Sequence, residues 1–130
     1  MVEGAHENRA VTMIYVDDVG RSRDFYRDVV GLELAADYGT YAEFTWGNLV
    51  LGLRSRDNAR RQFADAVAAS RTGASHQVTV HVDDVDGFAA RLSDGGADVL
   101  HPPTDQAWGM RSASFRDPDG HVWEICEPTD

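Results

Sequence analysis

The chain has 130 residues, a length that suits a single domain with one hydrophobic core. Its 22 acidic residues against 12 basic ones give a formal net charge of −10, which excludes the clustered basic surface that nucleic-acid binding requires. A hydrophobic content of 42% excludes a disordered acidic protein, and Cys126, the single cysteine, excludes an intramolecular disulfide.

The sequence also bears on where the protein works. No apolar run approaches the roughly 18 residues of a membrane span, and the N-terminal residues lack the basic and apolar regions of a signal peptide. We therefore expect a cytoplasmic protein with no membrane partner. Its acidic surface favours solubility and permits a cationic ligand.

The first half of the chain predicts a strand, a helix and three further strands. After a polar arm over residues 1–10, β-branched and aromatic side chains predict a strand over 11–16. Asp17 and Asp18 are typical of a helix N-terminus, and the helix is expected to end near Gly31. The following strands are expected at about 32–37, 41–46 and 48–54, with a tight reversal at Trp46-Gly47-Asn48.

The second half predicts the same order after a polar linker that contains a short helix. A strand is expected at 77–82 and a helix at 86–94, which ends at Gly95-Gly96. The next strand, 97–100, is expected to stop at His101-Pro102-Pro103, because proline cannot donate to a ladder. A loop through Trp108-Gly109 follows, and the last strands, 110–116 and 121–126, flank a turn at Asp117-Pro118-Asp119-Gly120.

A repeated motif divides the chain. Val16-Asp17-Asp18-Val19 recurs as Val82-Asp83-Asp84-Val85, an offset of 66 residues (82 minus 16), and a helix-period segment follows each copy. We therefore predict an α+β fold of two βαβββ modules in a single domain over residues 1–130. Module one is expected at about 11–54, the linker at about 55–75 and module two at about 76–127.

Several motifs in this order resemble the vicinal oxygen chelate superfamily. In the first module they are Val-Asp-Asp-Val before the helix, Asp24-Phe25-Tyr26 inside it and Val30-Gly31-Leu32 at its end. In the second module, Asp117-Pro118-Asp119-Gly120-His121 comes before a last strand that contains Glu124. The superfamily includes glyoxalase I, extradiol dioxygenases, fosfomycin-modifying enzymes and the bleomycin and mitomycin resistance proteins. The resemblance covers residues 11–127 and implies curled mixed sheets around a cavity, often between two chains of a homodimer.

The resemblance also indicates where a metal would bind. The superfamily's enzymes use one residue from the first strand and one from the last strand of each module, and these positions fall here on Val11, Gly52, Gln77 and Glu124. Val11 and Gly52 carry no side-chain donor for a metal. Gln77 and Glu124 alone supply too few donors for tight metal binding. We therefore expect no metal ligands and no cofactor.

Strand alternation places Gln77 and His81 on one face, which Glu124 is expected to share. His81 is a hydrogen-bonded wall residue, a ligand contact or a metal ligand, and His76 is a neighbouring alternative. Glu124 is a ligand contact, a catalytic base or the partner of an arginine, either Arg111 or Arg54. His101 and His121 are expected to be structural or exposed, and Cys126 to be a packed residue without an activating base.

The aromatic residues favour a ligand-binding role. The segment from Gln106 to Arg111 resembles a loop of the metal-free drug-binding members, in which an aromatic residue stacks on a planar ligand, and Trp108 takes that place. Mere packing is the alternative for Trp108. Trp46 and Tyr38 are weaker candidates of the same kind, and Trp123 is expected to pack under a helix.

These observations favour non-catalytic binding of a planar or cationic small molecule, such as an antibiotic. The ligand-binding residues would be Trp108, Trp46, His81, Glu124, Gln77 and Arg111. The alternative is a metal-dependent lyase, isomerase or dioxygenase with a shifted ligand set, so enzymatic activity stays open. A third reading is a regulatory module with a vestigial pocket.

Overall fold

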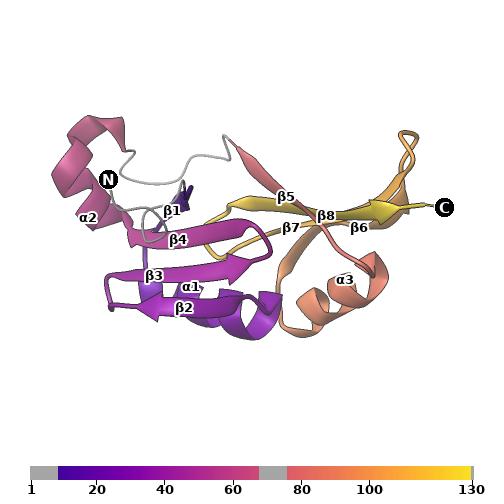
Figure 1. The fold of residues 1–130 in the computed structure, drawn as a ribbon, viewed down its shortest axis with the longest axis horizontal. Helices are drawn as coiled ribbons and strands as arrows, with labels where there is room; N and C mark the ends of the chain where they lie inside the picture. The colour runs from indigo at the N-terminus through magenta and orange to yellow at the C-terminus, as the bar shows by residue number, and fades with distance from the viewer. Residues whose placement is uncertain (1–8, 68–75, 130) are drawn as a thin grey trace.

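The computed structural model describes residues 9–67 and 76–129. Most of the expected polar arm, including His6, and residues 68–75 of the expected linker lie outside these ranges. Each half of the chain forms its own four-stranded sheet, and the two modules lie side by side along the long axis of the molecule (Figure 1). No helix within the described ranges has the length and apolar character needed to cross a membrane.

The first sheet has the strand order β1-β4-β3-β2. Its strands are β1 (Thr12–Val16), β2 (Glu33–Asp37), β3 (Tyr41–Trp46) and β4 (Leu49–Ser55), and only β1 and β4 are parallel. The helix between β1 and β2 begins as α1 (Val19–Asp24) and continues as a π-helical segment, η1 (Phe25–Val30). After β4, α2 (Arg56–Phe63) and the short η2 (Ala64–Ala66) form the described part of the linker.

The second sheet repeats this arrangement with the order β5-β8-β7-β6. It contains β5 (Gln77–His81), β6 (Asp98–Asp105), β7 (Met110–Arg116) and β8 (Val122–Pro128), with α3 (Val85–Asp94) after β5. The parallel pair is again the first and last strand. The predicted fold class, α+β with two βαβββ modules, is confirmed.

Equivalent residues begin the two helices. Asp18 accepts a hydrogen bond from the backbone N–H of Arg21, and Asp84 accepts one from Gly87, each at 3.0 Å. These carboxylates satisfy N–H groups that have no acceptor inside the helix. The repeated Val-Asp-Asp-Val motif therefore works as a strand-to-helix connection in both modules.

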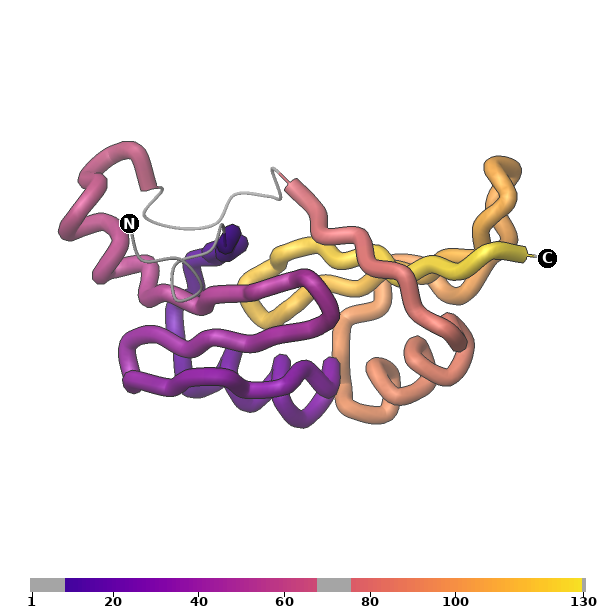
Figure 2. The backbone as a smooth tube through the Cα atoms, viewed as in Figure 1, coloured from indigo at the N-terminus to yellow at the C-terminus, as the bar shows by residue number. Residues whose placement is uncertain are grey.

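One hydrophobic core extends through both modules. Alternate residues of each sheet face the helices, and the buried set includes Val16, Tyr26, Phe44, Leu53, Leu92, Phe115, Trp123 and Ile125. In the tube view α3 lies below the strands of the second sheet, and α1 with η1 lies behind β2 and β3 of the first sheet (Figure 2). Because the helices cover one face of each sheet, the other face is left open.

The expectation that the strand after α3 stops at His101 is wrong. β6 continues through Pro102 and Pro103 to Asp105, and its pairing with β7 shifts register on both sides of His101. β6 is the edge strand, so one side of its backbone needs no partner and the prolines sit where no ladder bond is lost.

Candidate functional site

The open face of the second sheet carries a row of polar side chains. Thr79 lies opposite Glu124 on β8, Glu124 lies opposite Ser114 on β7, and Ser114 lies opposite His101 on β6. Residues that are directly opposite share a face of the sheet, so this row crosses all four strands. We call Thr79, Glu124, Ser114 and His101 the polar row.

Hydrogen bonds divide the polar row into two groups, one that contains Glu124 and one that contains Ser114. Gln77 Nε2 donates to Thr79 Oγ1 at 3.0 Å, and Thr79 Oγ1 donates to Glu124 Oε1 at 3.3 Å. On the other side, His101 Nδ1 lies 2.6 Å from Ser114 Oγ. The predicted grouping of Gln77 with Glu124 therefore holds through Thr79, while His101 was expected to be only structural or exposed.

A second row lies beside the first. His81, at the end of β5, is exposed and opposite Cys126, and Cys126 is opposite the buried Ser112. Ser112 Oγ accepts from Gln106 Nε2 at 3.1 Å. Cys126 is packed, as expected, with its Sγ 3.7 Å from the carbonyl of Val80, and burial raises the pKa of its thiol.

The half-buried Glu124 has no cationic partner among the described residues. Arg111 instead contacts Asp86 and Asp105, each at 2.9 Å. Arg54 donates to Asn58 at 2.8 Å and to Gln62 at 2.6 Å. Neither arginine that the sequence offered as an ion-pair partner for Glu124 takes that role, so the carboxylate meets the open face with only the Thr79 hydroxyl beside it.

Trp108 lies apart from this row. It occupies the β6–β7 turn with 59% of its surface exposed, and that hairpin extends from the far end of the second module (Figure 1). Ser114 is the fifth residue of β7 (Met110–Arg116), so it lies about 13 Å along the strand from its first residue, and Trp108 lies in the turn before that residue. Tyr38 is also exposed and stacks on Tyr41.

The residues at the superfamily's metal positions do not fit a metal. A Cβ at Gly52, the counterpart of Glu124, would lie 2.7 Å from Met13 Sδ and 2.9 Å from Tyr41 Oη. Tyr41 Oη donates to Glu43 at 2.7 Å, and burial, then this hydrogen bond, raises the pKa of Tyr41 to about 12. The described residues hold no cluster of three or more His, Cys, Asp or Glu side chains suited to a metal ion.

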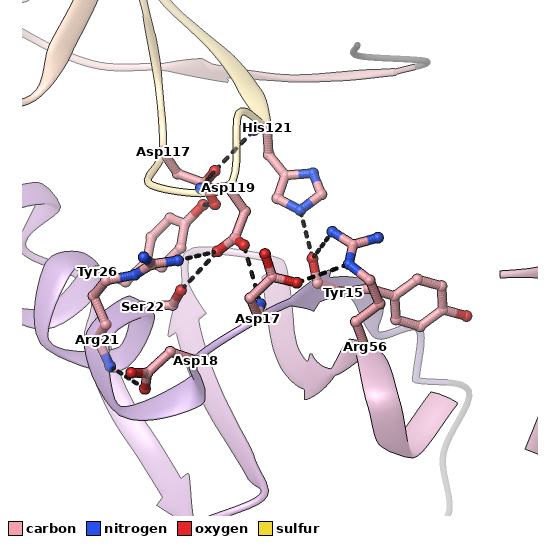
Figure 3. Close-up of polar contacts among 10 residues, drawn as sticks. All are labelled: Tyr15, Asp17, Asp18, Arg21, Ser22, Tyr26, Arg56, Asp117, Asp119 and His121. Atoms are coloured by element: carbon pink, nitrogen blue, oxygen red, sulfur yellow. Dashed lines mark hydrogen bonds and ion pairs between the residues drawn. The ribbon is translucent and has the colours of Figure 1, made fainter. Parts of the chain in front are cut away.

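The two modules meet at two pseudo-equivalent junctions. At the first junction, the β7–β8 turn lies against the start of α1 (Figure 3). Asp119 accepts from the N–H of Asp17 at 3.0 Å, from Ser22 Oγ at 3.1 Å and from Arg21 Nη2 at 3.4 Å. His121 Nε2 lies 2.8 Å from the carbonyl oxygen of Tyr15.

Asp117 completes the first junction from the same turn. Its carboxylate accepts from Tyr26 Oη at 2.6 Å and from the N–H groups of Asp119 and His121. Trp123 Nε1, buried as expected, donates to Tyr26 Oη at 3.0 Å. Burial raises the pKa of Asp117, and burial followed by the nearby Asp117 charge raises the pKa of Tyr26. Sequence reasoning identified the turn but missed this contact.

At the second junction, the β3–β4 turn lies near α3 and leaves a pocket of about 450 Å³. Trp46 stacks on Phe88 with ring centroids 5.6 Å apart and an interplanar angle of 12°. The pocket is lined by Val30, Gly31, Leu32, Trp46, His81, Val82, Asp83, Asp84, Gly87, Phe88 and Arg91. Two residues expected to bind ligand, Trp46 and His81, thus line the same pocket.

Comparisons with known proteins agree with this geometry. The model of the Glyoxalase/Bleomycin resistance protein/Dioxygenase superfamily matches residues 9–125. Protein YetH of Bacillus subtilis (strain 168) is 23% identical over 88% of this chain and 92% of its own length. Metallothiol transferase FosB of Staphylococcus saprophyticus is 25% identical over 85% of this chain and 70% of its own. A crystal structure of lactoylglutathione lyase from Agrobacterium tumefaciens has a TM-score of 0.73 and 27% identity, covering 94% of this chain and 95% of the lyase.

Proposed function

Because the chain belongs to the glyoxalase/bleomycin resistance protein/dioxygenase superfamily, we propose that it binds a planar, cationic small molecule, such as an antibiotic, without transforming it. The ligand lies on the open face of the second sheet. Glu124 supplies the anionic contact, and Gln77, Thr79 and His81 supply polar contacts beside it.

The observation that carries this proposal is that Glu124 has no cationic partner among the described residues. A half-buried carboxylate is normally paired, because burial removes part of its hydration. Glu124 has only a hydroxyl at 3.3 Å within the described chain, while both candidate arginines are engaged by other side chains. A cationic ligand would supply the missing countercharge, and the net charge of −10 would favour its approach.

The alternative is a metal-dependent lyase or transferase, the class that the names of the lactoylglutathione lyase and FosB suggest. Val11 and Gly52 oppose it, because neither offers a donor and the space above Gly52 is filled by Met13 and Tyr41. Two side-chain donors, Gln77 and Glu124, remain from one module.

Calorimetric titration against a panel of basic aromatic antibiotics tests the proposal. Glu124→Gln preserves the shape of the side chain and removes its charge. It should therefore lower the affinity for a cationic ligand by about tenfold and leave the affinity for a neutral analogue unchanged. Glu33→Gln, the same change on the exposed edge of the first module, is the matched control and should leave the affinity unchanged. Trp108→Ala measures whether that exposed ring belongs to the site.

Two outcomes would contradict this function. Equal affinities for the cationic ligand in the wild type and in Glu124→Gln would show that Glu124 makes no charge contact with the ligand. One tightly held divalent metal per chain, in protein purified without chelator, would favour the enzymatic alternative.

We further propose that the protein is a homodimer. Large apolar side chains are accessible on the open face of the first sheet, where Met13 is 40% exposed, and in the β2–β3 turn, where Tyr38 is 73% exposed. Sedimentation velocity at about 20 μM should show a dimer, because an obligate interface persists in this range. A monomer at that concentration would contradict this expectation.

A further inference from the structure

Three charged residues line the pocket at the second junction, the carboxylates of Asp83 and Asp84 and the guanidinium of Arg91, and Asp84 is engaged as the N-cap of α3. The Asp83 side chain has neither an ion pair nor a hydrogen bond within the described residues. Arg91 donates to the carbonyl oxygens of Val29 and Val30, at 3.3 and 2.6 Å, and meets no carboxylate there. No ion pair joins Asp83 to Arg91.

Comparison with the first junction explains why Asp83 is free. Its counterpart by the repeat offset is Asp17, whose carboxylate lies 3.0 Å from Arg56 Nε. The strand register pairs Thr12 with Leu51 and Val78 with Trp123, an offset of 72 residues between β4 and β8 (123 minus 51). By that offset the position of Arg56 falls on Pro128, which has no charge. The second module therefore lacks the cation that neutralises Asp17.

The same register explains why the space is empty of protein. The β3–β4 turn is one residue shorter than the β7–β8 turn, because the paired residues before the turn differ by 71 (115 minus 44) and those after it by 72 (123 minus 51), and its Gly47-Asn48 has no counterpart of the Asp119 carboxylate. A Cβ at Gly47 would meet nothing within 4 Å. The turn therefore brings a backbone and the Trp46 ring to the second junction, but no carboxylate.

The walls between the two charges are aromatic and apolar. Phe88 takes the place of Ser22 by the repeat offset, and Trp46 stacks on it. The Arg91 guanidinium carbon lies 4.5 Å from the centroid of the Phe88 ring. Arg91 lies seven residues after Asp84, the N-cap of α3 that follows Asp83, which is about 10 Å along the helix axis at the helical rise, and Phe88 lies between the two charges in the sequence.

We propose that this pocket is a binding site for an aromatic zwitterion whose two charges lie at opposite ends of a flat ring. The ligand's ammonium group pairs with Asp83, its carboxylate pairs with Arg91, and its ring lies against Trp46. The volume of about 450 Å³ falls within the usual range for small-molecule pockets. The site does not involve Glu124 and does not depend on the function proposed for the open sheet face.

A pair of isomeric probes tests this proposal. Para-(aminomethyl)benzoate carries its charges across the ring, whereas α-phenylglycine has the same atoms with both charges on one carbon. Benzylamine and benzoate each carry one of the two charges. Affinities are measured by titration on ¹⁵N-labelled protein, following the indole N–H signals of the three Trp residues, with Trp46 assigned from Trp46→Phe.

Para-(aminomethyl)benzoate should bind about tenfold more tightly than any of the other three probes and should shift the Trp46 signal. Asp83→Asn should reduce its affinity to that of benzoate and leave benzoate unchanged. Glu33→Gln, which changes an exposed carboxylate of the first sheet outside both proposed sites, is the control and should have no effect. Arg91→Lys, which keeps the charge, should retain the preference over benzylamine, with thermal melts confirming that the junction is folded.

Three results would overturn the proposal. The first is equal affinity for the two isomers, which would show that charge separation is not recognised. The second is an Asp83→Asn variant that binds as the wild type does. The third is no saturable shift of the Trp46 signal with any probe up to about 10 mM, a limit that excludes even weak specific binding.

Discussion

The two junctions between the modules differ in what each hairpin turn brings to the opposite helix. At the first, the β7–β8 turn inserts Asp117 and Asp119, whose oxygens accept hydrogen bonds from Tyr26, Ser22 and the backbone. At the second, the β3–β4 turn brings Trp46 and leaves about 450 Å³ open. Both junctions place a hairpin turn of one module near the first helix of the other module. The side chains that the two turns contribute are different. One junction of the duplicated fold is thus filled by buried hydrogen bonds, while the other keeps an open pocket.

The largest effect is expected from emptying the first junction. Asp119→Ala leaves the N–H of Asp17 and the Ser22 hydroxyl without their acceptor at a site where Asp119 is 3% exposed. We expect a loss of about 2 to 4 kcal/mol in the free energy of unfolding, because buried donors lose a charged partner. Urea denaturation monitored by circular dichroism measures it.

The second junction offers the matched control for this change. Gly47→Asn adds a side chain to the β3–β4 turn, where the backbone φ of 56° suits asparagine and no atom lies nearby. The unfolding free energy should change by less than about 1 kcal/mol. Similar losses of unfolding free energy in Asp119→Ala and Gly47→Asn would show that the two junctions contribute equally to stability. That result would contradict the difference between them.

A smaller effect is expected from the hydroxyl group of Tyr26. Tyr26→Phe removes the donor to Asp117 at 2.6 Å and the acceptor of Trp123 Nε1 while keeping the ring. Because two buried polar groups lose a partner, the unfolding free energy should fall by about 2 kcal/mol. Urea denaturation of the variant beside the wild type measures this loss. If the variant were as stable as the wild type, water would have to replace the hydroxyl.

The smallest effect concerns pH. Burial raises the pKa of the Asp117 carboxyl, so the folded state binds its proton more tightly than the unfolded state does. That stabilisation is present below the ordinary pKa and is lost as the pH rises through the raised value. The unfolding free energy of the wild type should therefore fall relative to Asp117→Asn as the pH increases above about 4. A constant difference between the two proteins across this range would be evidence against the raised pKa.

The fold could be predicted because it depends on short-range patterns. Alternating apolar residues define the strands, and Asp18 and Asp84 begin the helices where the repeat placed them. The error at Pro102 arose because edge position, which makes proline harmless, is a property of the whole sheet.

The candidate site was predictable only in part, for the same reason. Strand alternation correctly placed Gln77 with Glu124. It could not show that Arg111 binds Asp86, 25 residues away in sequence, or that His101 reaches Ser114 across a register shift. The docking of the Asp117 turn on the first helix is likewise a long-range contact with no local signal.

The crowded space above Gly52 limits how this chain can change. A glutamate there would need the Met13 and Tyr41 side chains to move aside, and moving Tyr41 breaks its hydrogen bond to Glu43. A mutational path that adds a donor at this position therefore disturbs the packing of the first sheet before a four-ligand centre is complete, because Val11 must also be replaced. The order of substitutions matters as much as their number, and a directed-evolution experiment would do best to start from a variant in which that space has already been cleared.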